Sequence, residues 1–271
     1  MGKTAIEWSE NVWNPVIGCS VTSPGCQRCY AMRMAGRLEA MGSPIYRGHT
    51  IKTKSGFVWN GKVSASNWDQ MTAPLRWKKP RRIFVNSMSD LFHEDMQVDV
   101  IDQVFAVMAM CPQHTFQLLT KRADGMRDYM LDQSSERASS RGNKVLALGY
   151  RGEMELLSFN HIWLGVSVED RARRSRIDVL RDVPSKVRFL SCEPLLEDLG
   201  DIDLTGISWV IAGSESGCGA RPCDLDWVRS IRDQCEDRGV SFFFKQHAKN
   251  GRKIRTPKLD GRTWMEFPCS V

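Results

Sequence analysis

The sequence lacks any long apolar run, and it has neither a visible leader nor an internal repeat. No stretch approaches eighteen consecutive apolar residues, which excludes a membrane-spanning helix. The opening segment, MGKTAIEWSENVWNP, contains one lysine and no apolar core, so it does not resemble a secretory signal. We therefore expect a cytoplasmic protein with no membrane partner.

A strong excess of one charge is also missing. The 271 residues include 38 Lys and Arg against 32 Asp and Glu, a net charge of +6 that is modest for a nucleic-acid-binding protein. Apolar residues make up 42% of the chain, which excludes wholesale disorder. The nine cysteines are an odd number, and a reducing compartment argues against a disulfide framework.

Short apolar runs alternate with segments of helical length. The predicted strands are 12–17, 82–85, 116–119, 162–166, 187–190, 209–212 and 241–244, and the predicted helices are 31–40, 98–110, 123–131, 172–180 and 225–238. This alternation predicts βαβ units and a parallel sheet. The expected fold class is α/β, a partial or full (β/α) TIM-type barrel of about six to seven parallel strands. A doubly wound open sheet is the alternative.

No segment has the composition of an interdomain linker, so residues 1–271 are predicted to form one barrel domain. Two insertions are expected, near residues 45–68 and 133–144. The second, QSSERASSRGNK, is polar almost throughout and predicts a mobile surface loop.

Nearly every predicted strand is followed by polar side chains. In parallel α/β folds the carboxyl ends of the strands carry the chemistry. We therefore expect a binding site ringed by these side chains, although polar residues are also common turn formers. The candidates are Ser87, Ser89, Asp90, Lys121, Arg122, Ser167, Glu169, Ser191, Glu193, Glu215, Lys245 and Gln246.

Three of the nine cysteines, Cys19, Cys26 and Cys29, lie within eleven residues after the first strand. Three thiolates suit a [4Fe–4S] cluster with one iron open to an external ligand. A structural zinc ion would need a fourth ligand, for which the sequence offers His49, Cys218 or Cys223. The third interpretation is that all three are buried free thiols. Cys26 and Cys29 follow Pro and Gly in a loop, which argues against burial in a core.

At this point the sequence resembles the radical S-adenosylmethionine superfamily, and more closely a phage and bacterial family recorded mainly as a domain of unknown function. The shared segments run along the whole chain: IEWSENVWNPVIGC, PGCQRCYA, SMSDLFHE, LLTKR, LGVSVED, EPLL, ESGCGARP, FFFKQ and LDGRTW. The better-understood relatives of that family resemble spore-photoproduct lyases, which repair DNA. Two features depart from the superfamily pattern: six residues separate the first two cysteines, where three are usual, and Arg28 replaces an aromatic residue, with Tyr30 following instead.

The resemblance implies that Cys19, Cys26 and Cys29 hold a [4Fe–4S] cluster whose open iron binds S-adenosylmethionine. Reduction of the cluster by an external electron donor would then yield a 5′-deoxyadenosyl radical. The same resemblance assigns Tyr30, Ser87, Ser89, Asp90, Lys121, Ser167 and Glu169 to the cofactor, with Arg122 as the alternative to Lys121. Substrate contacts would fall to Glu193, Glu215, Lys245 and Gln246.

Basic clusters near residues 76–82, 171–176 and 252–258 favour a DNA or RNA substrate, in base repair or modification. The first cluster precedes its strand and should lie at the edge opposite the site. Two other functions remain open at this point. One is a radical enzyme acting on a peptide or small metabolite, and the other is a non-catalytic binding protein stabilised by zinc or a cluster.

Overall fold

An eight-stranded sheet organises the chain, which the computed structural model describes over residues 4–54, 56–152, 159–215, 219–249 and 252–268. The strands lie in the order β1–β6–β7–β8–β9–β10–β11–β12. The first seven are parallel and β12 is antiparallel to β11. Their bounds are β1 (Asn11–Trp13), β6 (Arg82–Val85), β7 (Thr115–Thr120), β8 (Ile162–Ser167), β9 (Arg188–Cys192), β10 (Trp209–Gly213), β11 (Ser241–Lys249) and β12 (Arg252–Arg255).

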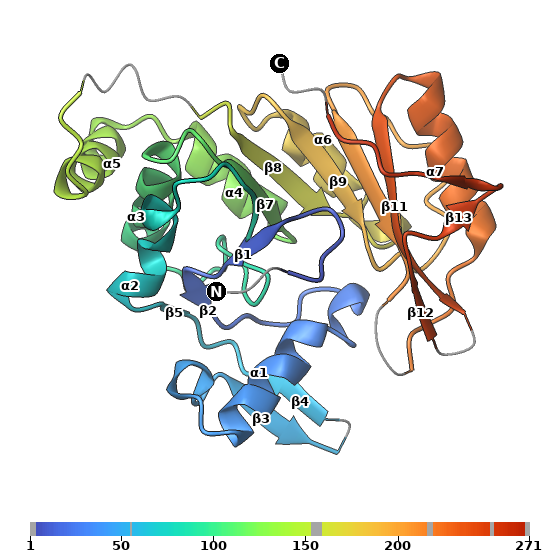
Figure 1. The fold of residues 1–271 in the computed structure, drawn as a ribbon, viewed down its shortest axis with the longest axis horizontal. Helices are drawn as coiled ribbons and strands as arrows, with labels where there is room; N and C mark the ends of the chain where they lie inside the picture. Colours follow the sequence, from blue (N-terminus) through green and yellow to red (C-terminus); the bar gives the residue numbers. More distant parts are fainter. Residues whose placement is uncertain (1–3, 55, 153–158, 216–218, 250–251, 269–271) are drawn as a thin grey trace.

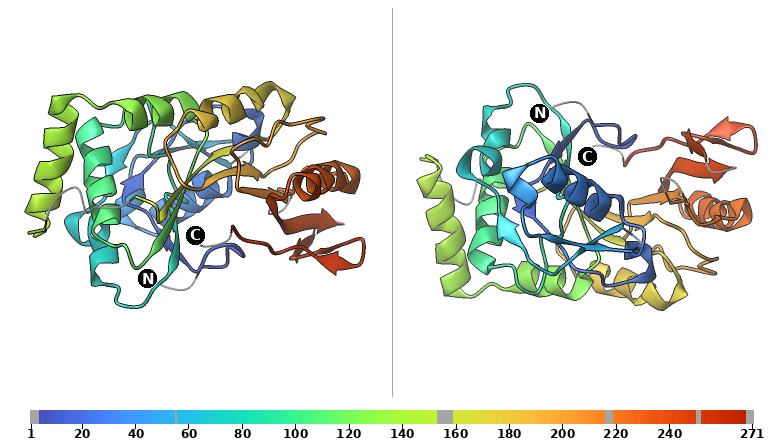
Figure 2. Two further views of the ribbon diagram at one scale, coloured as in Figure 1. Left: turned by 90° about the horizontal axis from the view of Figure 1, so that it is seen from above. Right: turned by 90° about the horizontal axis from the view of Figure 1, so that it is seen from below.

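The sheet curls into a half-barrel (Figures 1 and 2). Its neighbours follow chain order from β1 to β12, so it winds in one direction, as a barrel does, and does not reverse as a doubly wound sheet would. Within the described residues β1 and β12 remain edge strands, and the barrel does not close. The α/β class and the parallel sheet are confirmed. Seven of the eight strands are parallel, and the eighth, β12, is an antiparallel strand that the sequence analysis did not predict.

Helices cover the convex face of the sheet. They are α3 (Val98–Ala109), α4 (Ala123–Leu131), α6 (Ser175–Arg181) and α7 (Leu225–Asp237). The short α2 (Trp68–Met71) contacts β1, since the Gln70 carbonyl accepts a hydrogen bond from the Trp13 indole. The expected face of α3 is confirmed, because Val104, Val107 and Met108 are fully buried in the main core and Val100 packs against it. Apolar helix faces and sheet residues thus form one continuous core under the helices.

A second, smaller core fills the concave face. Trp209 lies at its centre, with Trp8, Phe189 and Phe243 packed around it at ring-centroid distances of 5.6–6.1 Å. The two cores arise because successive side chains of a strand point to opposite faces of the sheet. Phe189 faces the concave side, whereas Cys192 on the same strand packs under the helices. The concave side is therefore filled by aromatic rings below the level of the strand ends.

The first predicted insertion forms a small lobe with the first helix, α1 (Tyr30–Ala40). It contains the turn η2 (Pro44–Tyr46), the hairpin β3 (Thr50–Thr53) and β4 (Gly56–Trp59), and β5 (Ser64–Ala65), which pairs with β2 (Val16–Ile17). A Cβ atom at Gly36 would lie 2.0 Å from the ring of Phe57, so glycine permits α1 to rest on the hairpin. We call residues 30–54 and 56–65 the α1 lobe; it projects away from the sheet (Figure 1).

The second predicted insertion forms a helix and not the expected loop. Residues 133–144 were expected to form a loop, but most of them belong to the helix α5 (Ser135–Ala147), which Ser134 caps by accepting a hydrogen bond from the Arg137 amide. Helix α5 packs on α3, where the buried carboxylate of Asp102 accepts hydrogen bonds from Arg137 (2.6 Å), Ser140 (2.5 Å) and Tyr129 (2.9 Å). The polar composition therefore belongs to a largely exposed helix that ion pairs attach to α3, and not to a loop.

The remaining elements are short. The turns η1 (Pro24–Cys26), η3 (Ala73–Arg76) and η5 (Arg171–Arg173) join longer elements, and the hairpin β13 (Lys258–Leu259) and β14 (Arg262–Thr263) follows β12. Across the described part of the chain, no helix combines the length and apolarity needed to cross a bilayer.

Candidate functional site

A cavity of about 550 Å³ opens at the carboxyl ends of the parallel strands. Its base is apolar, formed by Ile6, Trp8, Phe84 and Leu119, which belong to or pack against the concave core. The structure brings most of the predicted site residues into its wall. They are Cys19, Cys26, Cys29, Tyr30, Ser87, Ser89, Asp90, Lys121, Arg122, Ser167, Ser191, Glu193, Glu215 and Lys245.

Residues 18–29, the cysteine loop, connect β2 to α1. The loop starts at Gly18, which has a φ of 88°. A Cβ atom at this position would lie 2.0 Å from the Lys62 carbonyl oxygen, so both the backbone conformation and the available space require glycine. Backbone amides of Cys26 and Cys29 donate to the carbonyls of Ser23 (2.9 Å) and Cys26 (3.0 Å). These turns aim both cysteines into the cavity immediately before α1 begins.

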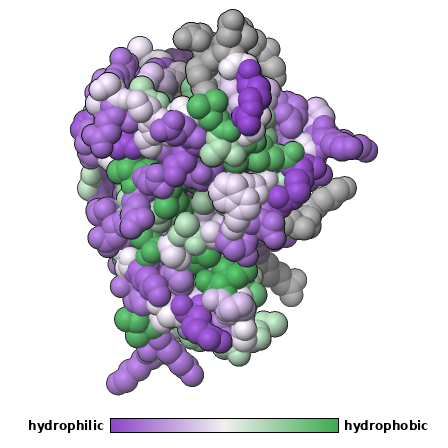
Figure 3. All heavy atoms as spheres, turned by 90° about the vertical axis from the view of Figure 1, so that its left-hand side faces the viewer, coloured by the Kyte–Doolittle hydropathy of each residue, from purple (hydrophilic) through white to green (hydrophobic). Residues whose placement is uncertain are grey.

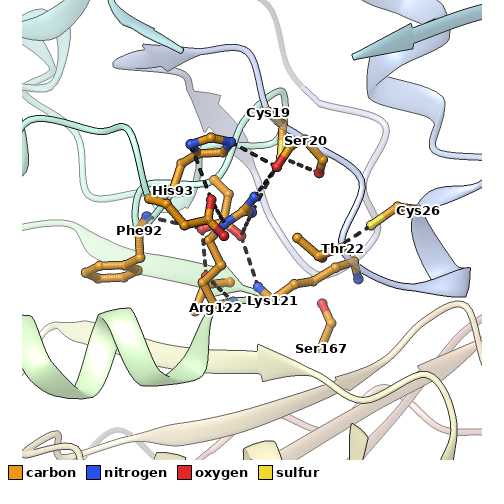
Figure 4. Close-up of polar contacts among 12 residues, drawn as sticks. Cys19, Ser20, Thr22, Cys26, Phe92, His93, Lys121, Arg122 and Ser167 are labelled. Carbon is orange, nitrogen blue, oxygen red and sulfur yellow. Dashed lines mark hydrogen bonds and ion pairs between the residues drawn. The ribbon is translucent and has the colours of Figure 1, made fainter. Parts of the chain in front are cut away.

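Cys26 is the one thiol of the three whose pKa is lowered. Burial opposes ionisation, but the Lys121 ammonium and hydrogen bonds from Thr22 and Ser23 outweigh it and lower the pKa of Cys26 below its ordinary value. The two hydroxyls lie 3.7 and 3.6 Å from its sulfur. Figure 4 shows Cys26 and Lys121 approaching the cavity from opposite sides. A lowered pKa favours the thiolate, the form that binds metal.

Cys19 lies beside a buried ion pair. Arg122 Nη1 donates to its sulfur at 3.7 Å and to Asp90 at 3.2 Å, and Arg122 Nη2 donates to Ser20 (Figure 4). Burial, and after it the Asp90 carboxylate, raises the pKa of Cys19 to about 12. Without a bound cation this thiol therefore stays protonated at neutral pH, and a metal would have to displace its proton.

Cys29 completes the set. Burial raises the pKa of its thiol, and the nearby Cys26 sulfur raises it further. All three cysteines line the same cavity. Within the described residues, no three His, Cys, Asp or Glu side chains converge to hold a single ion. The three thiols thus share a cavity wall without forming a converged ion site among the described residues.

The fourth ligands considered for zinc lie elsewhere. His49 is buried in the α1 lobe, where its Nε2 pairs with Ser64 Oγ at 2.9 Å. Cys223 is buried, with its sulfur 3.8 Å from the carbonyl of Asp224. Neither belongs to the cavity wall, and Cys218 lies outside the described residues. Of the fourth ligands named from the sequence, those that the structure describes therefore do not line the cavity with the three thiols.

Glu169 does not occupy the place predicted for it. It was expected to face the cofactor beside Ser167, but it is fully buried beneath the cavity wall. Its carboxylate accepts hydrogen bonds from Ser23 (2.7 Å) and Arg176 (2.9 Å) and pairs with Lys121 (2.7 Å). Burial opposes its charge, but Lys121 and Arg176 outweigh this and lower the pKa of Glu169. Glu169 therefore braces the cysteine loop through Ser23, and its predicted contact with the cofactor stays a prediction.

Asp90 reaches the cavity, but its oxygens are already engaged. Its carboxylate accepts from Thr120 Oγ1 (2.6 Å), from the backbone amides of Phe92 and Lys121 (both 3.1 Å) and from Arg122 (3.2 Å). Four donors use about all the lone-pair sites of a carboxylate. The predicted role of binding an ammonium would require one of these contacts to open.

The two serines after β6 and the nearby tyrosine have hydrogen-bond partners in the chain. Ser87 Oγ donates to Asn14 Oδ1 at 3.1 Å and Ser89 Oγ to the Val16 carbonyl at 2.8 Å. Tyr30 is half-exposed, and its hydroxyl donates to the Ser87 carbonyl at 2.8 Å. These bonds connect the start of α1, β1 and β2 to the segment after β6, so the serines brace the wall of the cavity.

The predicted substrate residues separate into two groups. Glu193 and Lys245 line the cavity as an ion pair at 2.6 Å, and Glu215 lines it while pairing with Arg221 and with Arg28 at 3.9 Å. Gln246 instead is buried behind the wall, where its amide donates to the Ser214 carbonyl at 2.6 Å. A β-bulge shifts the register of β11 by one residue here, so that Gln246 rather than Lys245 lies opposite Gly213 of β10.

Two functional candidates were not singled out from the sequence. Lys253 and Arg255 of β12 line the cavity and lie 3.3 and 3.4 Å from the Glu7 carboxylate. Burial and the neighbouring Lys245 lower the pKa of Lys253. Both belong to the basic tail noted in the sequence, and only the antiparallel return of β12 brings that tail to the site.

The cavity wall has an excess of positive charge. It contains six cationic side chains, from Arg28, Lys121, Arg122, Lys245, Lys253 and Arg255, against the three carboxylates of Asp90, Glu193 and Glu215. The basic cluster near residues 76–82, in contrast, precedes β6 and lies at the opposite edge, as predicted. Carboxylates beside the cavity wall balance its excess of cations, because Lys121 pairs with Glu169, Arg122 with Glu94, and both Lys253 and Arg255 with Glu7.

The chain belongs to a family described as "Protein of unknown function (DUF5131)", whose model matches residues 3–268. No curated protein and no solved structure matches the chain.

Proposed function

We propose that this chain is a radical S-adenosylmethionine enzyme in which Cys19, Cys26 and Cys29 hold a [4Fe–4S] cluster. The observation that carries the proposal is the gathering of these three thiols in one cavity at the carboxyl ends of parallel strands. When bound and reduced, such a cluster supplies the electron that cleaves S-adenosylmethionine into methionine and a 5′-deoxyadenosyl radical.

The chain's own residues perform the supporting tasks. Lys121 favours the Cys26 thiolate, and Arg122 donates to the Cys19 sulfur, a contact of the kind that tunes cluster potentials. The aromatic base formed by Trp8 and Phe84 excludes water from below. A shielded cavity limits the loss of a reactive radical to solvent.

We further propose a nucleic-acid substrate for this enzyme, in base repair or modification. Its support is the position of Lys253 and Arg255 in the cavity wall, where phosphate groups would compete with the Glu7 carboxylate for these two cations. Phosphate contacts release counterions, so binding should weaken steeply as salt rises. An affinity that stays unchanged between low and moderate salt would count against nucleic acid and favour a peptide or small metabolite.

The decisive experiment is anaerobic reconstitution with iron and sulfide. A brown protein with about four irons per chain, which on reduction releases 5′-deoxyadenosine from S-adenosylmethionine, is the expected result. A colourless protein that takes up zinc would contradict the proposal and favour a zinc-stabilised binding protein. An assembled cluster that leaves S-adenosylmethionine intact would contradict the enzymatic part alone.

A further inference from the structure

Positive charge is concentrated in the α1 lobe. Residues 30–65 contain six cations and one carboxylate, so they carry five of the six net positive charges of the chain. The carboxylate, Glu39, is engaged by the Gly48 amide (2.7 Å) and the Thr50 hydroxyl (3.0 Å). Among the described residues, no carboxylate lies within ion-pair distance of the six cations, whereas Arg181 and Arg232 elsewhere each have several. The cations are Arg33, Arg37, Arg47, Lys52, Lys54 and Lys62.

Apolar side chains are exposed among these cations. The exposed fractions are 43% for Met34, 81% for Met41, 38% for Ile45 and 55% for Ile51. In Figure 3 the lower part of the molecule, where the lobe lies, shows hydrophobic spheres beside strongly hydrophilic ones. Methionine with arginine is a composition typical of protein–protein interfaces.

The lobe adjoins the proposed cluster. Helix α1 begins at the residue after Cys29, and the buried core of the lobe, which includes Met32 and Trp59, packs against both Cys19 and Cys29. A partner seated on the lobe would lie next to the cysteine loop. Since electron transfer weakens steeply with distance, this is a favourable place for a protein that delivers electrons.

We propose that the α1 lobe is the docking surface of a small acidic electron-carrier protein. The inference rests on the proposed function and names the partner for the same site. In the reaction the carrier loses one electron and the [4Fe–4S]²⁺ cluster gains it to become [4Fe–4S]⁺, with no bond formed or broken. Complementary charge would speed the encounter, and the exposed aliphatic side chains would supply a small contact of the size usual for transient redox complexes.

The composition of the lobe favours a protein over a nucleic acid. Single-stranded nucleic acids bind surfaces where aromatic rings alternate with cations. Apart from Tyr30, whose hydroxyl is bonded to the Ser87 carbonyl, the exposed large side chains of the described lobe are aliphatic. Nucleic acid is therefore assigned to the cavity rim, and the carrier to the lobe.

The test uses a flavodoxin with an acidic surface as the probe and two double variants of the full chain. Arg37→Glu/Lys52→Glu reverses two exposed charges on the lobe, and Lys78→Glu/Lys79→Glu makes the same change in net charge at the opposite edge of the sheet. At low ionic strength the lobe variant should accept electrons from reduced flavodoxin about tenfold more slowly, and the control variant at nearly the wild-type rate. High salt should remove the difference. Equal rates for the two variants would overturn the proposal.

Two further measurements separate this proposal from the proposed function. Dithionite, a small reductant, should reduce the cluster equally in all three proteins, and a lobe variant that fails with dithionite would place the defect in the cluster and overturn the docking interpretation. If the wild type assembles no cluster, the proposed function fails, and binding of flavodoxin to the metal-free proteins then decides the docking surface. Loss of oligonucleotide binding in the lobe variant, with unchanged flavodoxin binding, would assign the surface to nucleic acid and overturn the proposal.

Discussion

The hydroxyl of Ser23 donates a 2.7 Å hydrogen bond to the buried carboxylate of Glu169. This bond joins the cysteine loop to the segment that follows β8, although 146 positions separate the two residues. Lys121 binds the same carboxylate from the end of β7, so one side chain aligns the loop with two strand ends. Because Ser23 also contacts the Cys26 sulfur, the position of a candidate metal ligand depends on Glu169.

We predict that Glu169→Gln loosens the cysteine loop. The amide leaves Lys121 and Arg176 without a buried counter-charge, so unfolding at neutral pH should become easier by about 3–5 kcal/mol. In the metal-free protein, hydrogen exchange should accelerate in the peptide that holds residues 18–29. Ser23→Ala is the milder comparison and should accelerate exchange in that peptide alone; exchange at the wild-type rate there would refute the positioning role.

The same carboxylate predicts a pH dependence. Its pKa is lowered on folding, so its contribution to stability is present above the unfolded value of about 4.5 and is lost as the pH falls through the folded value. The stability difference between wild type and Glu169→Gln should therefore be constant near neutral pH and shrink below about pH 4.5. Urea denaturation at pH 7 and pH 4 measures this, and a gap that widens at the lower pH would contradict the assignment.

Two glycines provide a matched pair of substitutions. A Cβ at Gly25 would lie 2.6 Å from a Glu169 carboxylate oxygen, so Gly25→Ala should disturb the clamp and reduce iron uptake on reconstitution. A Cβ at Gly142 in α5 would meet nothing within 4 Å, so Gly142→Ala should raise stability by about 0.5–1 kcal/mol through helix propensity. Thermal denaturation and iron analysis distinguish the two, and equal iron uptake would count against the clamp.

The attachment of α5 can be tested at Asp102. Asp102→Asn keeps the shape but removes the charge that holds Arg137 and Arg141, with an expected loss of about 2 kcal/mol. Limited proteolysis should then cut within Ser135–Ala147 while the sheet stays intact. Unchanged protease resistance of this segment would mean that apolar contacts such as buried Val145 suffice.

The cysteines themselves carry the last prediction. Cys26→Ala and Cys29→Ala should each abolish cluster assembly, seen as loss of the brown colour and of the spectrum of the reduced cluster. Cys235→Ala is the control, because Cys235 is buried on α7 away from the cavity. A cluster retained in the Cys26 or Cys29 variant would remove that residue from the ligand set.

Local patterns were sufficient to predict much of this molecule. The seven parallel strands and the main helices follow from apolar runs and spacing, since burial on two faces of a sheet or one face of a helix imposes those periods. The polar strand ends and the three-cysteine loop could also be predicted, because the carboxyl ends of parallel strands lie at one edge of a sheet. Most of the predicted side chains do line one cavity there.

Tertiary contacts decided the rest. Beyond a strand's last hydrogen bond the two-residue alternation no longer holds, so the loop path sends Glu193 into the cavity and buries Glu169 beneath it. The segment that forms α5 has the composition of a loop, and its ion pair with Asp102 attaches it to α3 as a helix. The antiparallel β12 brings Lys253 to the site. Sequence by itself determined which groups are available, because composition and period are local properties. Only the fold decided which of them face the cavity and which support it, because that depends on partners distant in the chain.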